Sequence, residues 1–265
     1  MRKSKIIFLF SFLLFCSQRQ VGLNIAGSTS VEPFIEKIAE EFMMENSGVK
    51  INVQGGGSTA GIQATFNHTC DIGTSSRHLK PSEDGLKVFL MAFDGIAIIV
   101  HPKNPISSLT ASQIRDVFSG RIKNWNELGG WNSKIIPVTR EEGSGTRGAF
   151  EELIMGATAI SDACLVQDSN GAVREIIATT PQAIGYISAG LVDSRVKALA
   201  IDGVYPSYEN FFRGEYKFVR PFILLTRDEP SGLVKKFIDY VLSKKTQEIL
   251  KKEGLIPIIE IKGER

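Results

Sequence analysis

The sequence contains few of the residues on which metal sites, disulfide frameworks and hydrolytic active sites depend. It has three cysteines and three histidines among 265 residues, and no Cys-x-x-Cys pair. Zinc scaffolds and disulfide-rich mini-proteins need such clusters, so both classes are excluded. The chain also lacks the Gly-x-Ser-x-Gly sequence of an α/β-hydrolase nucleophile. Its histidines, His68, His78 and His101, lie beside turn or proline residues, so we expect no enzymatic activity, no metal and no other cofactor.

An excess of positive charge is also absent. Three of the 31 basic residues lie in the first 15 positions, so the rest of the chain carries 28 basic residues against 29 acidic ones. A protein that binds nucleic acid through electrostatics needs a strongly basic face, so we exclude nucleic acid as a partner. Any small anion must then be bound by local dipoles and one or two arginines.

The N-terminal apolar run is too short to cross a membrane. Residues 6–15 are apolar except for one serine, far fewer than the ~20 residues of a membrane-spanning helix. A basic stretch precedes this run, which is typical of a secretory signal. Cys16 ends it, as in the signal at which bacteria lipidate a cysteine, although Phe15 is bulkier than the usual residue there. We expect residues 1–20 to be a signal or lipoprotein segment, with an ordinary signal peptide or an uncleaved anchor as alternatives.

The targeting segment places the folded protein outside the cytoplasm, in the periplasm or on the cell surface. In that environment Cys70 and Cys164 could form a disulfide. Both have apolar neighbours in the sequence, however, and free cysteine is often buried as a small apolar residue. We therefore predict two separate thiols.

Strand and helix patterns alternate along the chain, which predicts parallel sheets joined by right-handed crossovers. The predicted strands are 23–26, 49–53, 70–73, 134–139, 183–187, 196–201 and 218–226, and the predicted helices are 31–42, 60–67, 81–88, 108–118, 172–179 and 232–252. We expect Ser30 to cap the first helix, with Pro33 in its first turn. We predict loops at residues 121–130 and 203–215. Residues 89–100 predict either a long strand that crosses between two lobes or one buried strand with a bulge.

Four polar turns follow predicted strands, at 27–30, 54–59, 74–77 and 140–147. Because ligands of such sheets bind at the carboxyl ends of strands, we expect the turns to share one site. The last turn, Arg140-Glu-Glu-Gly-Ser-Gly-Thr-Arg147, leads into a helical pattern. Its backbone N–H groups, hydroxyls and guanidinium groups are donors suited to an oxyanion. The alternatives are a glycine-rich connection with solvated arginines and, at 55–60, a weak dinucleotide fingerprint.

Together, these motifs resemble the substrate-binding protein of bacterial ABC phosphate importers. The resemblance runs in order from about residue 24 to the C-terminus and rests on Ala26-Gly-Ser-Thr-Ser-Val31, Gln54-Gly-Gly-Gly-Ser-Thr59, Asp71-Ile-Gly-Thr-Ser-Ser-Arg77, Asp94-Gly-Ile-Ala97, residues 109–130, residues 140–147 and Gly185-Tyr186. It implies an α/β, two-lobed periplasmic-binding-protein-like fold of type II. Each lobe would be a mainly parallel sheet flanked by helices, with the ligand in the interlobe cleft. We expect lobe 1 to comprise 21–94 plus 216–265, and lobe 2 to comprise 95–215.

The resemblance also implies the ligand, its binding residues and its partners. The ligand is inorganic phosphate, delivered to the membrane permease of an ABC importer by a non-catalytic monomer. The implied phosphate-binding residues are Ser28, Thr29, Ser30, Ser58, Ser76, Arg140, Ser144, Gly145 and Thr146. Glu142 falls where the family has the acid that pairs with Arg140. Arg147 either reaches the ligand or caps the site.

The third turn departs from part of the family. Some members carry an aspartate there that accepts the proton of hydrogen phosphate and repels sulfate, whereas this chain has Ser76. Asp71 or Glu142 could contribute an acceptor instead. A binder of another tetrahedral oxyanion, such as sulfate, molybdate or tungstate, is therefore the first alternative. An extracytoplasmic phosphatase or esterase is a more remote one.

Overall fold

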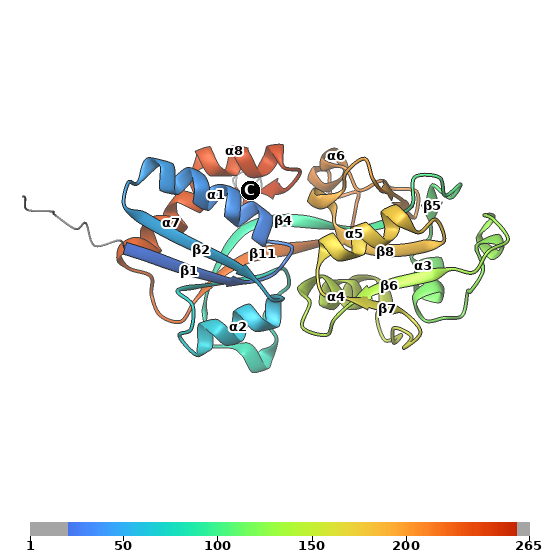
Figure 1. Cartoon of the computed structure of the whole chain (residues 1–265), viewed down its shortest axis with the longest axis horizontal. Helices are drawn as coiled ribbons and strands as arrows, with labels where there is room; N and C mark the ends of the chain where they lie inside the picture. Colours follow the sequence, from blue (N-terminus) through green and yellow to red (C-terminus); the bar gives the residue numbers. More distant parts are fainter. Residues whose placement is uncertain (1–20, 259–265) are drawn as a thin grey trace, which may run out of the picture.

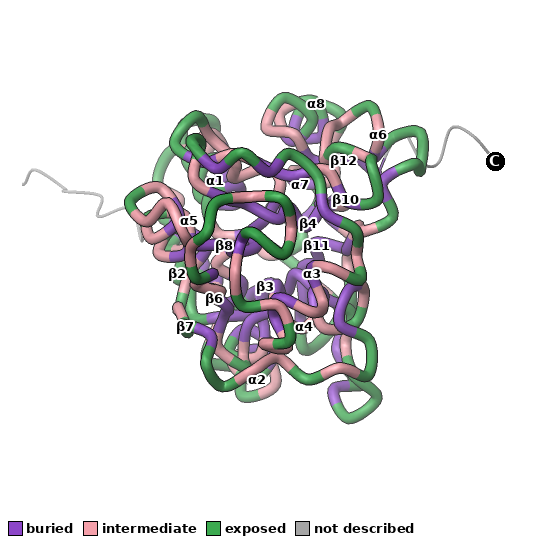
Figure 2. The backbone as a smooth tube through the Cα atoms, turned by 90° about the vertical axis from the view of Figure 1, so that its right-hand side faces the viewer, coloured by how far each residue is buried: buried purple, intermediate pink, exposed green. Residues whose placement is uncertain are grey.

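The computed structural model describes residues 21–258, which form two α/β lobes side by side (Figure 1). The predicted targeting segment, Cys16 included, lies outside the described residues. In Figure 1 the first and last parts of the chain, blue and red, make one lobe, and the green and yellow middle part makes the other. Figure 2 shows that buried backbone fills the interior beneath exposed loops. Two lobes joined by crossing strands confirm the predicted fold class.

Lobe 1 is a sheet with helices on both faces. Its elements are β1 (Val21–Gly27), α1 (Glu32–Glu45), β2 (Val49–Gly55), α2 (Ser58–Phe66), β3 (Ile72–Ser75), β11 (Val219–Thr226), α7 (Gly232–Val241) and α8 (Lys244–Lys252). Strands β2, β1 and β3 are parallel neighbours, and β11 runs antiparallel beside β3. Phe222 and Leu224 pack in the core with α1, whereas Ile223 and Leu225 pack with Ile62 of α2. This alternation along one strand is what covers both faces of the sheet.

Lobe 2 repeats the plan with more irregular connections. Its elements are β5 (Ser108–Leu109), α3 (Ala111–Phe118), β6 (Ile136–Arg140), α4 (Gly145–Phe150), β7 (Leu165–Gln167), α5 (Asn170–Thr179), β8 (Ala183–Ser188), β9 (Lys197–Ala198), β10 (Ala200–Ile201) and α6 (Tyr208–Phe212). Strands β8, β6 and β7 are parallel neighbours. In the core, the rings of Phe150 and Tyr186 stack with centroids 3.9 Å apart and an interplanar angle of 6°. That stack fixes α4, and therefore the turn before it, against the sheet.

Two long strands connect the lobes. Strand β4 (Lys87–Val100) pairs with β11 over residues 87–95 and with β8 over residues 96–100, so the crossing-strand prediction is confirmed. The register of β4 against β11 shifts at Met91, which has no partner in that pairing. Strand β11 is the second crossing strand and lies between β3 and β4, so it is not an edge strand. Its proline, Pro221, lies beyond the residues that pair with β3. A proline there costs no hydrogen bond to β3.

Several local predictions were wrong. Residues 81–88 form one 3-10 turn (Pro81–Glu83) and the start of β4, because Glu83 turns its carboxylate back onto Lys80 N and Arg77. The single helix predicted over 232–252 is two, since α7 ends at Val241 with Leu242 as its C-cap and Ser243 caps the start of α8. The loop predicted over 203–215 contains α6, whereas the loop over 121–130 is confirmed, with one 3-10 turn (Trp125–Leu128).

Of the predictions about single side chains, one was wrong and the others were confirmed. Val31, not Ser30, is the N-cap of α1, while the proline lies in the first turn as expected. Cys70 and Cys164 are free thiols, and burial raises the pKa of Cys164 to about 11. Across residues 21–258, no helix is both long and apolar enough to span a membrane.

Candidate anion-binding site

The four predicted turns meet between the lobes. Each follows the carboxyl end of a strand: β1, β2 and β3 in lobe 1, and β6 in lobe 2. Helices α1, α2 and α4 begin shortly after three of them, so their first backbone N–H groups have no partners within the helix. The arrangement expected from the sequence, four donor-rich turns at one place, is therefore present.

Three serine hydroxyls form the lobe 1 wall. Ser28 Oγ donates to Ser76 Oγ at 2.9 Å, and Ser58 Oγ lies 3.3 Å from Ser76 Oγ. Ser58 Oγ also accepts the backbone N–H of Ser76 at 3.0 Å. All three residues are buried. Because buried hydroxyls must be hydrogen-bonded, the three turns hold one another in a fixed geometry.

The lobe 2 turn closes directly onto this wall. Ser30 Oγ lies 2.8 Å from Thr146 Oγ1, and Arg140 Nη2 donates to Thr29 Oγ1 at 3.1 Å. Gly145 comes so close that a Cβ there would lie 2.1 Å from Ser58 Oγ and 2.5 Å from Ser76 Oγ. A side chain at this position is incompatible with the observed approach of the lobes.

In the structure, eight of the nine sequence-predicted residues each lie against at least one other member of the set. The ninth, Ser144, is also buried and caps α4 by accepting the backbone N–H of Arg147 at 3.2 Å. Its role is to begin the helix whose next residues face the other lobe.

Arg140 is the central charge of the lobe 2 turn, and one of its nitrogens has no partner. The residue is 1% exposed. Its Nε and Nη2 atoms donate to Glu141 at 3.0 Å each and to the carbonyl oxygens of Gln167 and Asp168. Nη1 is buried with no hydrogen-bond partner in the described structure. An unpaired buried guanidinium N–H is costly, so this position favours an acceptor supplied by a ligand.

The prediction that Glu142 pairs with Arg140 was wrong. The pairing acid is Glu141, whose carboxylate accepts from Arg140 through both oxygens. Strand β6 ends at Arg140, and the chain then turns at positions 142 and 143. The turn leaves Glu142 exposed and places Glu141 beside the guanidinium.

The other two arginines of the turns are used within the protein. Arg147 donates to Glu151 at 2.8 Å and to the carbonyl oxygen of Arg140 at 3.1 Å, so of its two predicted roles the structure supports the one that caps the site. Arg77 forms a buried two-point pair with Glu83 at 2.7 and 2.8 Å. Asp71, considered as an alternative acceptor, is exposed and accepts the backbone N–H of Asn24 instead.

Sequence reasoning missed one buried arginine, Arg220. Arg220 of β11 is 2% exposed and donates through Nε and Nη2 to Asp94 Oδ2 at 3.0 and 2.9 Å. The two residues are direct cross-strand partners on the crossing strands β11 and β4. Asp94 is fully buried, which raises the pKa of its carboxyl, whereas the charge of Arg220 opposes that rise. A charged residue inside an otherwise apolar strand was the available signal.

Arg220 reaches the predicted site through two serines. Its Nη1 donates to Ser76 Oγ at 3.2 Å and its Nη2 to Ser30 Oγ at 3.1 Å. Asn170, at the start of α5, also donates to Ser30 Oγ, at 2.9 Å, and accepts the backbone N–H of Ser188. Ser188 in turn donates to Asp94 at 2.8 Å. The ion pair is therefore connected to both lobes and to the hydroxyl cluster.

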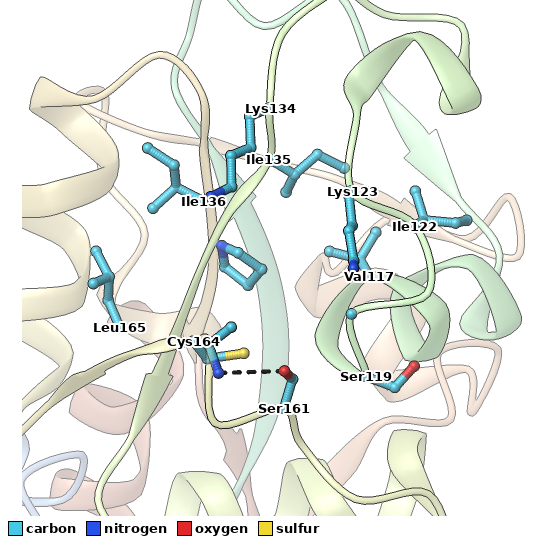
Figure 3. A pocket seen from close by; sticks show the side chains of 13 residues that line it. Val117, Ser119, Ile122, Lys123, Lys134, Ile135, Ile136, Ser161, Cys164 and Leu165 are labelled. Carbon is cyan, nitrogen blue, oxygen red and sulfur yellow. Dashed lines mark hydrogen bonds between the residues drawn. The ribbon is translucent and has the colours of Figure 1, made fainter.

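A separate pocket of about 500 Å³ lies within lobe 2 (Figure 3). Its lining is mainly apolar, with Lys123 and Lys134 from the loop before β6 and the thiol of Cys164. None of the predicted site residues lines it. Residues 21–258 also contain no group of three His, Cys, Asp or Glu side chains that could hold a metal ion. The four-turn cluster is therefore the candidate site.

Comparisons with known proteins agree with this geometry. A family model described as the PBP superfamily domain matches residues 17–245. The phosphate-binding protein PstS of Bacillus subtilis (strain 168) is 36% identical over 250 residues, which cover 92% of this chain and 83% of that protein. A solved putative phosphate ABC transporter substrate-binding protein from Clostridium perfringens, with bound phosphate, has a TM-score of 0.87 at 41% identity and covers 89% of this chain and 99% of its own.

An ABC-type phosphate transport receptor from Vibrio cholerae has a TM-score of 0.74 at 36% identity, with 88% of this chain and 99% of that one covered. These three matches each cover between 88% and 92% of this chain. The chain belongs to the PBP superfamily and, within it, to the family of phosphate-binding proteins of bacterial ABC phosphate importers.

Proposed function

We propose that the chain is an extracytoplasmic solute-binding protein that captures inorganic phosphate between its lobes and delivers it to the membrane permease of an ABC importer. The observation that carries this proposal is Arg140 Nη1, a buried cationic donor without a partner at the centre of four donor-rich turns. A charge-assisted hydrogen bond to an anion is the interaction that such a donor lacks. The named relatives, which are phosphate-binding proteins, support the choice of phosphate.

The proposed ligand contacts come from both lobes. Ser28, Thr29, Ser30, Ser58 and Ser76 belong to lobe 1, and Arg140, Ser144, Gly145 and Thr146 belong to lobe 2. Hydroxyls and backbone N–H groups can donate to all four oxygens of a tetrahedral anion at once. No nucleophile–base pair is present in this set, so the role is binding rather than catalysis.

Release of the ligand is proposed to occur by opening of the lobes around the crossing strands. The contacts between the lobes at the site include Ser30 to Thr146, Ser30 to Asn170, Arg140 to Thr29, and the backbone N–H of Thr59 to the carbonyl oxygen of Gly143 at 3.1 Å. We place lobe 1 at 21–94 plus 216–265 and lobe 2 at 95–215. Two separate cores support this division, although Tyr216 and Ile256 pack in the lobe 2 core.

Calorimetry on the protein without its first 15 residues tests the function. Saturable, one-site phosphate binding is the expected result, and no heat of binding at millimolar phosphate would refute it. Parallel titrations with sulfate, molybdate and tungstate identify another oxyanion as ligand if one of them binds more tightly. A chromogenic phosphate ester should show no turnover.

Location and assembly are part of the same proposal. We propose a periplasmic or cell-surface protein, with lipid on Cys16 as a possible anchor, that acts as a monomer. Mass spectrometry of the protein purified from membranes would detect a lipidated N-terminal cysteine. Light scattering with and without phosphate would report the mass in solution, and capture of the permease by the loaded protein would test the delivery step.

A further inference from the structure

A fifth turn lies at the same edge of the lobe 2 sheet as the turn of Arg140. It comprises residues 167–170 and connects β7, the parallel neighbour of β6, to α5. Arg140 and Gln167 are partners in the register of β6 and β7, so the two turns leave the sheet side by side. The carbonyl oxygens of Gln167 and Asp168 accept hydrogen bonds from Arg140. The last residue of this turn, Asn170, begins α5 and is buried, with 2% of its surface exposed.

The side chain of Asn170 connects the two lobes. Its Oδ1 atom accepts the backbone N–H of Ser188, within lobe 2, at 3.2 Å. Because only the oxygen of an amide group accepts hydrogen bonds, this contact fixes the direction of the amide, and Nδ2 must face the other way. There Nδ2 donates to Ser30 Oγ of lobe 1 at 2.9 Å. One end of the amide is therefore anchored in lobe 2, and the other end reaches across the cleft.

Ser30 is the lobe 1 residue that this amide holds. Its hydroxyl also lies 2.8 Å from Thr146 Oγ1 and accepts from Arg220 Nη2 at 3.1 Å. In the division proposed for the lobes, Arg220 stays with Ser30 when the lobes separate, whereas Asn170 and Thr146 leave with lobe 2. The hydrogen bond from Asn170 to Ser30 therefore exists only when the lobes are closed.

We propose that Asn170 is a positioning residue that slows the release of phosphate by holding Ser30 across the closed cleft. This inference rests on the proposed function, in which Ser30 contacts the ligand and release requires the lobes to open. An anion enters the open protein, where Asn170 and Ser30 are apart, so the association rate constant should not depend on Asn170. Dissociation starts from the closed protein and must break this hydrogen bond, so the dissociation rate constant should depend on it.

The test measures both rate constants for phosphate in Asn170→Ala. Stopped-flow mixing of the loaded protein with a fluorescent phosphate sensor gives the dissociation rate constant, koff. Dividing koff by the calorimetric Kd gives the association rate constant, kon. We expect koff to rise about threefold to tenfold, as the loss of one neutral hydrogen bond implies, with kon unchanged. An unchanged koff, or a loss of affinity that arises from kon, overturns the inference.

A double-mutant cycle separates action through Ser30 from a structural role. In the Ser30→Ala background the amide has no hydroxyl to hold, so Asn170→Ala should change koff by less than about 1.5-fold. If the variant merely displaced the turn through the lost contact with Ser188, Arg140 would be disturbed whether or not Ser30 is present. An equal effect on koff in both backgrounds therefore overturns the inference.

Asn104→Ala is the matched control. Asn104 is also 2% exposed, lies in lobe 2 and accepts a backbone N–H of its own lobe, that of Ile106 at 3.0 Å. Its replacement should lower the melting temperature of the phosphate-free protein about as much as Asn170→Ala does, but leave koff at the wild-type value. An equal rise of koff in the two variants would show that any loosening of lobe 2 speeds release, and it overturns the inference.

Asn170→Ser covers a failure of the alanine variant to fold. Serine leaves a smaller cavity than alanine and suits the beginning of a helix, but its hydroxyl is one atom too short to reach Ser30. The same rise in koff with unchanged kon is expected, and wild-type rate constants in this variant contradict the proposed role. A wild-type protein that does not bind phosphate overturns the proposed function, and the inference with it.

Discussion

Replacing Gly145 by alanine should abolish tight binding without destabilising the free protein. The added Cβ would lie 2.1 Å from Ser58 Oγ and 2.5 Å from Ser76 Oγ, whereas ordinary contacts begin near 3.4 Å. Relief requires the lobes to stay apart by roughly 1 Å, since packed atoms that are this close repel steeply. The clash exists only when lobe 2 is closed on lobe 1. An open protein is unaffected, and alanine is the better residue in the first turn of α4.

The size of the effect follows from the contacts that such a gap breaks. Ser30 to Thr146 at 2.8 Å and Arg140 to Thr29 at 3.1 Å would both lengthen beyond hydrogen-bonding range. Their loss corresponds to about 2–4 kcal/mol, one bond being neutral and one charge-assisted. A loss of about thirtyfold to a thousandfold in phosphate affinity is therefore expected.

Calorimetry measures the affinity for phosphate. Thermal unfolding in the absence of phosphate measures the stability of the protein. Gly143→Ala is the matched control, because its Cβ would lie 3.8 Å from the nearest side-chain atom, Thr59 Cβ. It should bind phosphate as the wild type does. Wild-type affinity in the Gly145 variant, or an equal loss in the Gly143 variant, would show that the lobes do not close as described.

Three further predictions follow from the ion pairs. Arg140→Ala should weaken phosphate binding by about 2–5 kcal/mol in calorimetry, since the ligand loses the free donor and the carboxylate of Glu141 is left without its partner. Glu141→Gln should weaken binding measurably, whereas Glu142→Gln should not, because Glu141 is the acid of this pair that accepts hydrogen bonds from Arg140. Arg77 lowers the pKa of the Glu83 carboxyl below 4.5, so that pair stabilises the fold at pH above 4.5 and the contribution is lost on acidification through the lowered pKa. The melting temperatures of wild type and Glu83→Gln should therefore converge as the pH falls below 4.5.

The turns of the site could be predicted from sequence because each is a local feature. Glycine, serine and threonine cluster directly after an apolar strand pattern, and the carboxyl ends of parallel strands share an edge. The long strand β4 was predictable for the same reason, since its two apolar runs are continuous apart from Asp94 and Gly95. The role of Asp94 itself was not predictable, because its partner Arg220 is 126 positions away.

The errors in the site prediction are errors of side-chain direction and of distance. Glu141 and Glu142 are adjacent, and only the turn after β6 decides which one faces Arg140. Serine is a residue type that often caps helices, but the hydroxyl of Ser30 accepts hydrogen bonds from Arg220 and Asn170. These tertiary contacts override the local preference. These pairings span 140 and 190 positions, and no local pattern encodes them.

The two arginines of the site are each neutralised by a neighbouring carboxylate, and this explains how a near-neutral protein can enclose an anion. Arg140 pairs with Glu141 and Arg220 with Asp94, so closing the lobes buries no net charge from these residues. A site of unpaired arginines would repel itself and resist burial. Here the charge of the ligand must be balanced by the free nitrogen of Arg140 and by oriented hydroxyl and backbone dipoles. Fixed dipoles need not reorganise when the ligand enters, and they act strongly in a site from which water is excluded.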